Sequence, residues 1–257
     1  MVDNKQNSFS LHGKIAIITG ASKGIGEAIA VAYASAGATV VVSSRKAESV
    51  DEVASRLKNS GAQAEACAAH MGCENDITAL VNFTLATYGG IDILVNNAAT
   101  NPVFAPLMGI NDAACRKVMD VNLMGPLTLS KAVQPHMLRR GGGAIINIAS
   151  VGGLTPERFL GMYSVSKAAL ISLTKVMAKE WGEAGIRVNA ICPGLIKTRF
   201  SAALWQNEAV LKEAMRHVPT GRIGVPMDVA YMALFLASEA AAYCNGGIYT
   251  VDGGMMA

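Results

Sequence analysis

Short apolar runs rich in β-branched residues alternate along the chain with longer stretches of helical pattern. Several runs are apolar throughout, as strands must be when helices cover both faces of a parallel sheet. The alternation of strand and helix predicts right-handed crossovers and an α/β fold with a doubly wound parallel sheet. The predicted strands are Lys14–Thr19, Thr39–Ser44, Gln63–Ala68, Ile91–Asn96, Ala144–Ala149, Ile186–Ile191 and Ile248–Val251. The predicted helices are Gly26–Ser35, Glu48–Ser60, Asn75–Tyr88, Asp112–Arg139 and Tyr163–Trp181.

The pattern contains no linker, so we predict a single domain over residues 1–257, with residues 1–12 as an N-terminal extension. Residues 195–225 are the least regular stretch, and we predict that they form a substrate loop or lid with helical character around Asn207–His217. Two interpretations stay open for the apolar side chains near this region, which suit a substrate pocket and buried core or subunit contacts equally well. These side chains are Phe159, Leu160, Leu204, Trp205 and Met215.

Composition and charge exclude several classes of protein. A formal net charge of +3 is too small to indicate nucleic acid or an anionic membrane surface as a partner. The five cysteines show no C-x-x-C spacing and have no histidine at metal-ligand spacing, so we expect neither a disulfide framework nor a metal site. The chain shows no apolar stretch long enough for a membrane span and no signal-peptide core, so we predict a cytoplasmic protein.

A glycine-rich turn follows the first predicted strand and opens the first predicted helix. Glycine permits a tight turn and lets backbone N–H groups approach a pyrophosphate, whose charge the helix N-terminus favours. The turn, Thr19-Gly20-Ala21-Ser22-Lys23-Gly24-Ile25-Gly26, therefore predicts a dinucleotide site. Its G-x-S-x-G spacing also matches the nucleophile elbow of α/β hydrolases, but no later histidine stands in a context that supports a catalytic triad.

The end of the second strand bears on the choice of cofactor. NAD enzymes of this architecture usually carry an acidic residue there, which binds the ribose hydroxyls. Here the strand ends in Ser44 and Arg45, which can donate to a 2′-phosphate, and Lys23 of the turn lies within the same predicted site. We therefore predict NADP(H) over NAD, and the missing acid also disfavours a methyltransferase. The alternative interpretation is that these cations are ordinary surface charges, and the missing acid favours the NADP(H) interpretation over it.

Tyr163 and Lys167 are four residues apart and face the same side of a predicted helix. A phenol with an ordinary pKa of about 10 becomes a base at neutral pH only if its pKa falls by roughly three units, which takes about 4 kcal/mol. A neighbouring ammonium and a positively charged nicotinamide are the groups that we expect to supply this. Ser150 ends the preceding strand, where it can hydrogen-bond a developing oxyanion beside Tyr163.

Asn122 falls inside the long predicted helix Asp112–Arg139. Asparagine is a poor residue for a helix interior, because its amide competes for backbone hydrogen bonds. The misfit indicates a kink, and we expect the kink to hold a water molecule for a proton relay.

Together these residues resemble the short-chain dehydrogenase/reductase family, NADP-preferring type, over Gly13 to Gly254. The resemblance implies a single-domain Rossmann fold with a seven-stranded parallel sheet in the order 3-2-1-4-5-6-7, and it implies a homotetramer. The motifs that carry it are Thr19-Gly-x-x-x-Gly-x-Gly26, Asn96-Asn97-Ala98-Ala99, Asn122, Ser150, Tyr163-x-x-x-Lys167, and Pro193-Gly194 with Thr198.

The resemblance also implies roles for these residues. Tyr163 would be the general acid/base, Ser150 would orient the carbonyl, Lys167 would lower the Tyr163 pKa and bind the nicotinamide ribose, and Asn122 would complete the proton relay. The other implied contacts to the cofactor come from Gly20, Ser22, Lys23, Gly24, Ile25, Gly26, Ser44, Arg45, His70, Met71, Asn97, Ala98, Ala99, Pro193, Gly194, Ile196 and Thr198.

The chain departs from the family pattern at two positions. His70-Met71 replaces the usual Asp-Val at the adenine, so that contact would rest on the backbone or on His70, and Ala99 replaces a glycine. The expected function is reduction of a ketone, aldehyde or 3-oxoacyl compound, or oxidation of the matching alcohol. Two alternatives stay open: an NAD-dependent alcohol dehydrogenase of the same family and a non-catalytic nucleotide-binding module.

Overall fold

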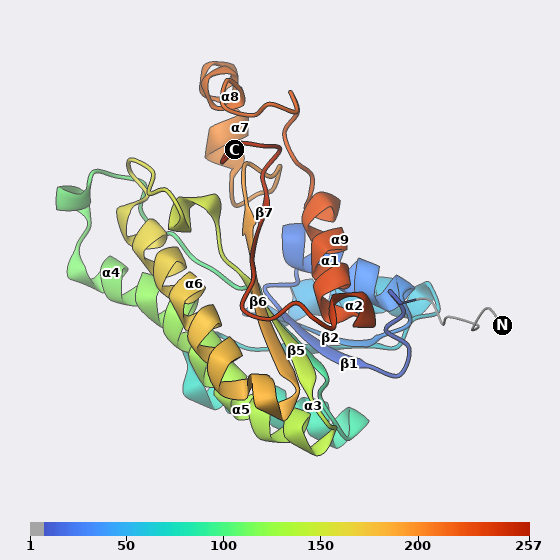
Figure 1. The fold of residues 1–257 in the computed structure, drawn as a ribbon. Helices are drawn as coiled ribbons and strands as arrows, with labels where there is room; N and C mark the ends of the chain where they lie inside the picture. The colour runs from blue at the N-terminus through green and yellow to red at the C-terminus, as the bar shows by residue number, and fades with distance from the viewer. Residues whose placement is uncertain (1–7) are drawn as a thin grey trace.

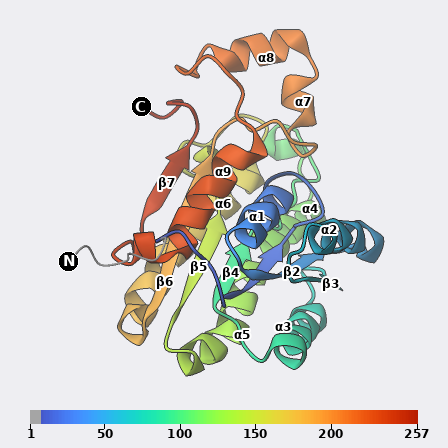
Figure 2. The same cartoon turned by 90° about the vertical axis from the view of Figure 1, so that its right-hand side faces the viewer.

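The computed structural model describes residues 8–257, and at residues 203, 204 and 210 it describes the main chain only. Its strands form one parallel sheet in the order β3-β2-β1-β4-β5-β6-β7, which confirms the predicted fold class (Figures 1 and 2). The strands are β1 (Ile15–Thr19), β2 (Thr39–Ser44), β3 (Ala64–Ala68), β4 (Ile93–Asn96), β5 (Gly143–Ile148), β6 (Ile186–Pro193) and β7 (Ile248–Val251).

Helices cover both faces of the sheet. Buried side chains of α1, α2 and α9 form one core with the strands, and those of α3, α5 and α6 form the core on the other face. The helices are α1 (Gly24–Ser35), α2 (Ala47–Asn59), α3 (Glu74–Tyr88), α4 (Asp112–Met119), α5 (Gly125–Arg139), α6 (Gly161–Trp181), α7 (Ala202–Trp205), α8 (Glu208–Met215) and α9 (Pro226–Ala237).

The polypeptide departs from the predicted elements in two helices. The predicted helix Asp112–Arg139 is α4 and α5 joined by a π-helical turn, η2 (Asp120–Met124), so the expected irregularity at Asn122 is confirmed. Helix α9 was not predicted, because its sequence PMDVAYMALFLA is apolar nearly all round and gives no helical period. In the structure α9 packs against α1, and the buried Tyr33 hydroxyl donates to Ala233 O at 2.9 Å.

Part of the predicted N-terminal extension packs against the body of the protein. Residues 1–7 lie outside the described part of the chain, but Leu11 is buried and its N–H donates to Ala36 O at 2.8 Å. Ala240 N donates to Ser8 O at 3.1 Å, and the Phe9 ring lies 6.3 Å from that of Phe235 in α9. Within residues 8–257, every helix is too short or too polar to cross a membrane.

The loops at the carboxyl ends of the strands create the site. Helices α7 and α8 project beyond this end of the sheet in both views (Figures 1 and 2). They belong to the segment 195–225, whose two ends are hydrogen-bonded to each other: Gly224 N donates to Leu195 O at 3.0 Å, and Lys197 N donates to Gly224 O at 2.8 Å. The segment therefore leaves the body of the protein and returns to it at one point beside β6.

Candidate active site

The ends of β1 and β4 are joined by a network of short hydrogen bonds. The Thr19 hydroxyl accepts from Asn97 N at 3.0 Å and from Ala98 N at 3.1 Å, and it donates to Val95 O at 3.1 Å. The Asn97 amide donates to Thr19 O at 2.9 Å and to Gly20 O at 3.1 Å. We call these residues the edge network (Thr19, Gly20, Asn97 and Ala98). It fixes the glycine-rich turn against the neighbouring strand.

The glycine-rich turn has no room for side chains at two of its glycines. A β carbon on Gly20 would lie 2.8 Å from Asn97 Nδ2 and 2.9 Å from Ala98 Cα, and one on Gly26 would overlap Asn97 Nδ2 and Gly20 O. Gly20 and Gly24 adopt φ values of 64° and 63°, which glycine tolerates best. A β carbon on Gly24 would face Thr198 at 3.3 Å, so the turn lies opposite the start of the lid segment. The backbone at the α1 N-terminus thus fits a pyrophosphate, with Thr198 across from it.

The predicted nucleotide end of the site lies at β2 and β3. Ser44 ends β2, and the side chain of the next residue, Arg45, is exposed before α2. The side chain of Lys23, which precedes α1, is exposed as well. Ala69 N donates to Ser44 O at 3.0 Å, so the loop after β3 is tied to this corner. His70 uses its ring to hold its own loop, because Nδ1 accepts from Gly72 N at 3.0 Å.

The Met71 side chain belongs to the core. It is 4% exposed, so any contact from this position to an adenine would come from the main chain. Ile196 is likewise a core residue at 5% exposed, and its carbonyl accepts from the Ser201 hydroxyl at 2.5 Å. The predicted cofactor contacts at these two positions are therefore main-chain contacts, if they form. Asn96, the first residue of the Asn96-Asn97-Ala98-Ala99 motif, is buried and donates to Ser130 Oγ at 3.1 Å and to Asn147 Oδ1 at 2.9 Å.

Ser150 and Tyr163 meet at the carboxyl end of β5. Ser150 caps the short helix η3 (Val151–Gly153), where its hydroxyl accepts from Gly152 N at 3.1 Å. The same hydroxyl is hydrogen-bonded to Tyr163, which lowers the Tyr163 pKa, but burial has the larger effect and the net result is a pKa raised to about 12. The protein's own groups therefore keep the phenol protonated at neutral pH. The predicted lowering, which involves a positively charged nicotinamide as well as Lys167, stays a prediction.

Lys167 is buried one helical turn after Tyr163. It is 2% exposed, and its ammonium donates to Ile148 O, the last residue of β5, at 2.7 Å. Its Nζ lies 5.7 Å from the centre of the Tyr163 ring. Burial lowers the Lys167 pKa to about 8, because the interior disfavours the charged form. Lys167 thus stands where its proton is weakly held and close to the phenol.

The Asn122 side chain forms hydrogen bonds with two neighbouring segments. Its oxygen accepts from Thr100 N at 2.8 Å, and its nitrogen donates to Thr100 O at 3.0 Å and to Ser166 Oγ at 3.1 Å. The residue is fully buried within the π-helical turn η2. Asn122 therefore joins the loop after β4 to α6 at the level of Lys167, and it positions the helix that carries the tyrosine.

The remaining predicted residues lie around this centre. Pro193 ends β6, and Gly194 N donates to Val251 O at 3.0 Å. A β carbon on Gly194 would lie 2.8 Å from Asp252 Cα, so glycine is needed where the chain passes β7. Ile25 packs partly buried against the core of the α1 face. The structure gives Ser22 and Ala99 intermediate exposure beside the turn and after the edge network.

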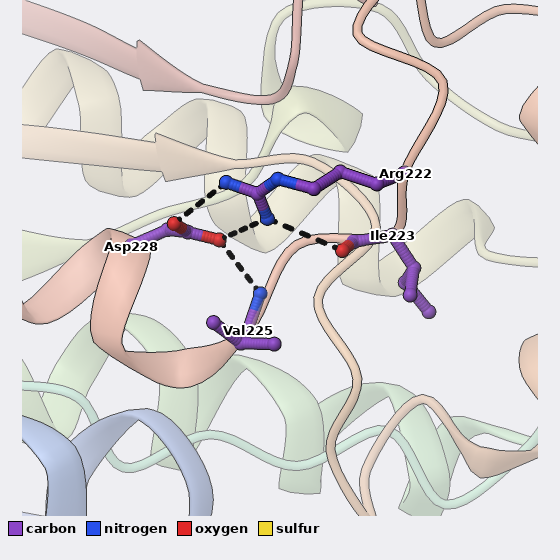
Figure 3. Close-up of polar contacts among 4 residues, drawn as sticks. All are labelled: Arg222, Ile223, Val225 and Asp228. Atoms are coloured by element: carbon purple, nitrogen blue, oxygen red, sulfur yellow. Dashed lines mark hydrogen bonds and ion pairs between the residues drawn. The ribbon is translucent and has the colours of Figure 1, made fainter.

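Residues 195–225, the predicted lid, contact Tyr163 and are anchored beside α9. The Phe200 ring lies 5.8 Å from the Tyr163 ring, and Trp205 Nε1 donates to Thr198 O at 2.9 Å. Arg222 forms a bidentate pair with Asp228 in the first turn of α9, at 2.7 and 2.9 Å, and the same carboxylate accepts from Val225 N at 2.8 Å (Figure 3). The side chain of Leu204 lies outside the described residues.

Comparison with known proteins identifies the family. Residues 20–256 match the family model described as enoyl-(acyl carrier protein) reductase. The chain is 42% identical over 244 residues to dehydrogenase/reductase SDR family member 4 of Oryctolagus cuniculus, covering 95% of this chain and 94% of the relative. The Caenorhabditis elegans protein of the same name is 39% identical over 255 residues, covering 98% of both. The chain belongs to the short-chain dehydrogenase/reductase family. It is thus an oxidoreductase of CH–OH and C=O groups, and the hydrolase interpretation of the G-x-S-x-G spacing is wrong.

Solved structures of this short-chain dehydrogenase/reductase family share the whole fold. A gluconate 5-dehydrogenase from Burkholderia cenocepacia, in complex with NADP and tartrate, superposes with a TM-score of 0.93 at 35% identity, covering 96% of this chain and 97% of that one. A 7α-hydroxysteroid dehydrogenase, in complex with NADH and 7-oxo glycochenodeoxycholic acid, superposes with a TM-score of 0.93 at 38% identity and covers 96% of both chains. Two proteins with this fold have thus been solved with very different bound molecules, a small polar acid and a steroid.

Sequence reasoning missed several residues that complete the site of this short-chain dehydrogenase/reductase. Thr100 and Ser166 hold Asn122, but nothing in the sequence links three distant segments. Cys192 is buried beside the centre, and its pKa is raised to about 11 chiefly by burial. Glu157 lies on the loop between Ser150 and Tyr163 and acts on the phenol electrostatically. Its position in that loop was the one available signal.

Replacing Lys167 with Met is expected to alter how stability depends on pH. The folded pKa of about 8 lies below the ordinary value of 10.5, so between these values the unfolded chain binds a proton that the folded protein does not. The free energy of unfolding of the wild type should therefore rise relative to Lys167→Met by about 2 kcal/mol between pH 8 and pH 10. Urea denaturation at several pH values measures this.

The control is Lys179→Met, in the last turn of the same helix, whose side chain is exposed. Its difference from the wild type should stay flat over the same range of pH. A flat difference for Lys167→Met as well would show that the lysine is not held in a low-dielectric site.

Proposed function

We propose that this protein is an NADP(H)-dependent oxidoreductase that reduces a ketone, aldehyde or 3-oxoacyl carbonyl, or oxidises the corresponding alcohol. The observation that carries the proposal is the hydrogen-bonded pair of Ser150 and Tyr163, with Lys167 buried one helical turn away. These groups lie at the carboxyl end of the sheet, where parallel α/β folds bind their ligands. Two donors directed at one point are suited to the oxygen of a carbonyl group.

Each residue of this group has a chemical role in the proposal. Ser150 donates a hydrogen bond to the carbonyl oxygen, and Tyr163 transfers its proton to that oxygen as negative charge develops there. The raised pKa of Tyr163, about 12, keeps the phenol protonated at neutral pH, which is the form that a general acid needs. Lys167 holds its proton weakly and is placed to stabilise the phenolate that remains. The dinucleotide supplies or accepts the hydride when it is bound.

Asn122 acts as a positioning residue in this proposal. Its three hydrogen bonds fix Thr100 and Ser166, so that α6 presents Tyr163 toward Ser150. A water molecule at the π-helical turn, completing a proton relay, stays a prediction. The turn supports it, because a π-helical turn disturbs the regular backbone hydrogen bonding that would otherwise exclude such a relay.

The proposed dinucleotide site extends from the edge network to the end of β2. The backbone of the glycine-rich turn, with Gly20, Gly24 and Gly26, would hold the pyrophosphate. Thr198, across from Gly24, would contact the nicotinamide end, and Ser44, Arg45 and Lys23 would bind a 2′-phosphate. Ser22, Ile25, His70, Met71, Ala99, Pro193, Gly194 and Ile196 complete the proposed set.

The preference for NADP(H) is supported by the end of β2 and by known structures. Arg45 is exposed, and a planar guanidinium suits bidentate binding of a phosphate. The Burkholderia cenocepacia neighbour was solved with NADP, whereas the steroid dehydrogenase was solved with NADH. NAD-dependent dehydrogenation in the same site is therefore the alternative that the cofactor experiment must separate.

Replacing Arg45 with Ala is expected to raise KM for NADPH by about 10- to 100-fold, since a lost charged hydrogen bond costs about 1.5–3 kcal/mol. KM for NADH should change little, because NADH lacks the 2′-phosphate. Steady-state kinetics with both cofactors measure the ratio. Lys58→Ala is the control, because this lysine lies near the other end of α2 and pairs with Glu65. Equal losses with both cofactors would contradict the assigned role of Arg45.

Replacing Tyr163 with Phe is expected to lower the rate of carbonyl reduction by at least about 100-fold, the usual contribution of a positioned general acid. Binding of NADPH, followed by its fluorescence, should be preserved. The test uses a panel of ketones, aldehydes and 3-oxoacyl thioesters, with an enoyl thioester added, and follows the absorbance of NADPH. Wild-type turnover of the enoyl compound alone would overturn the proposal of carbonyl reduction, and wild-type binding of NADPH without any turnover would favour a nucleotide-binding module.

We further propose a homotetramer in the cytoplasm. Exposed apolar side chains support two subunit contacts, one around α9 with Tyr231 and Tyr243, and one on α6 with Val165 and Val176. The five free cysteines of the protein support a reducing compartment. Light scattering coupled to size-exclusion chromatography should give a mass near four times 26.7 kDa. A monomer at micromolar concentration would refute the tetramer.

A further inference from the structure

The loop between η3 and α6 carries a carboxylate next to the reacting groups. A β carbon on Gly152 would lie 3.4 Å from Ser150 Oγ and 3.9 Å from Glu157 Oε1. Both oxygens are therefore close neighbours of one small residue. Glu157 also acts electrostatically on the Tyr163 hydroxyl, where its negative charge raises the pKa of the phenol. The carboxylate thus stands within reach of a group attached to the carbonyl that Ser150 and Tyr163 would hold.

The position of Glu157 is set by its main chain. Its N–H donates to the buried Ser164 hydroxyl at 3.5 Å, and its carbonyl accepts from Leu160 N at 3.3 Å. These contacts tie the residue to the first turn of α6, close to Tyr163. The side chain retains exposure, while partial burial of its carboxylate raises the pKa of that group.

The carboxylate of Glu157 has no cationic partner among the described residues. Burial is the cause of its pKa shift, and no ion pair joins it to a lysine or arginine of residues 8–257. The cation next to it in the chain, Arg158, is instead placed over an aromatic ring, 5.5 Å from the centre of Phe159. An unpaired carboxylate beside a binding site is a fixed negative potential for whatever binds there.

Aromatic rings lie on the loops that surround the pair of Ser150 and Tyr163. The rings of Phe104 and Phe159 lie 5.5 Å apart and join the loop after β4 to the loop after β5. Phe200 packs against Tyr163 from the lid side. All three phenylalanines are exposed at the open end of the sheet. Aromatic faces combined with a carboxylate are the chemistry that binds alkylammonium groups, through cation–π attraction and charge pairing.

We propose that Glu157 is a specificity-determining residue, and that it selects carbonyl substrates carrying a positively charged group against those carrying a carboxylate. This inference rests on the proposed oxidoreductase function and deepens it. The carbonyl oxygen is held by Ser150 and Tyr163, and a cationic substituent pairs with the Glu157 carboxylate, which no cation of the described residues occupies. An anionic substituent in the same place is repelled. The residue acts on the substrate and leaves the hydride step to the groups already described.

The experiment compares three acetophenones that differ in the charge of one substituent: a trimethylammonium, a tert-butyl and a carboxylate group at the ring. The wild type should show a higher kcat/KM for the cation than for the anion. Glu157→Gln, which keeps the shape and removes the charge, should reduce this cation-to-anion ratio by about tenfold, and any effect of the lost charge on Tyr163 cancels in the ratio because all three compounds share it. Benzaldehydes with the same substituents serve if the protein reduces them faster.

Salt dependence adds a readout that a purely structural role would not change. Raising the ionic strength should shrink the cation-to-anion ratio of the wild type, because dissolved ions screen the carboxylate, and should leave the ratio of Glu157→Gln unchanged. Glu183→Gln is the matched control: it makes the same change of charge in η4 (Gly182–Ala184), at the opposite end of α6. Its ratio should equal that of the wild type.

The outcomes separate this inference from the proposed function. Oxidation of NADPH with a ratio unchanged in Glu157→Gln overturns the role of Glu157 alone. A wild-type preference for the anion overturns it as well, and would point to the exposed Arg199 of the lid. If the wild type fails to oxidise NADPH with every carbonyl compound tested, whatever its charge, the oxidoreductase proposal itself fails.

Discussion

The candidate site depends on a buried hydrogen bond between the Lys167 ammonium and the carbonyl of Ile148. An ammonium in the protein interior is costly unless a carbonyl or a carboxylate satisfies it. The bond fixes α6 against the end of β5. Tyr163 lies one turn earlier on that helix, and Ser150 lies two residues beyond that strand, so a single contact sets the two reacting hydroxyls in register. The Ser150–Tyr163 hydrogen bond follows from it.

A second layer of polar contacts keeps this arrangement rigid. Asn122 fixes the loop after β4 and the first turns of α6 together. The edge network holds the glycine-rich turn against the end of β4. Both sets are buried or nearly so, where unsatisfied polar groups would be expensive. The proposed catalytic centre and the proposed dinucleotide site consequently lie along one hydrogen-bonded edge of the sheet.

The sequence was informative where a local pattern has a physical cause. Strands covered on both faces show as apolar runs, glycines mark the turn at Gly20, and the misfit of Asn122 in a helix reflects the π-helical turn. Helix α9 was not predicted, because an almost wholly apolar helix has no polar face and therefore shows no helical period. The partners of Asn122 also escaped prediction, since they come from distant segments.

The charge state of the site was the hardest property to predict. The Tyr163–Lys167 spacing does not reveal that burial within the protein raises the phenol pKa, because desolvation depends on every surrounding atom and not on one neighbour. Glu157 lies in an irregular loop whose path the sequence does not define. Such properties emerge only when the fold brings separate loops together.

The lack of space for side chains at Gly20 and Gly26 limits how proteins of this kind diversify. No side chain can be added at Gly20 or Gly26 without displacing the amide of Asn97, so this part of the surface is closed to variation. The loop after β2 lies on one side of the glycine-rich turn, and the loops around Phe159 and Phe200 lie on the other side. These loops are free to change. Nucleotide choice and substrate choice can therefore be inherited as separate modules, each rewritten without disturbing the other.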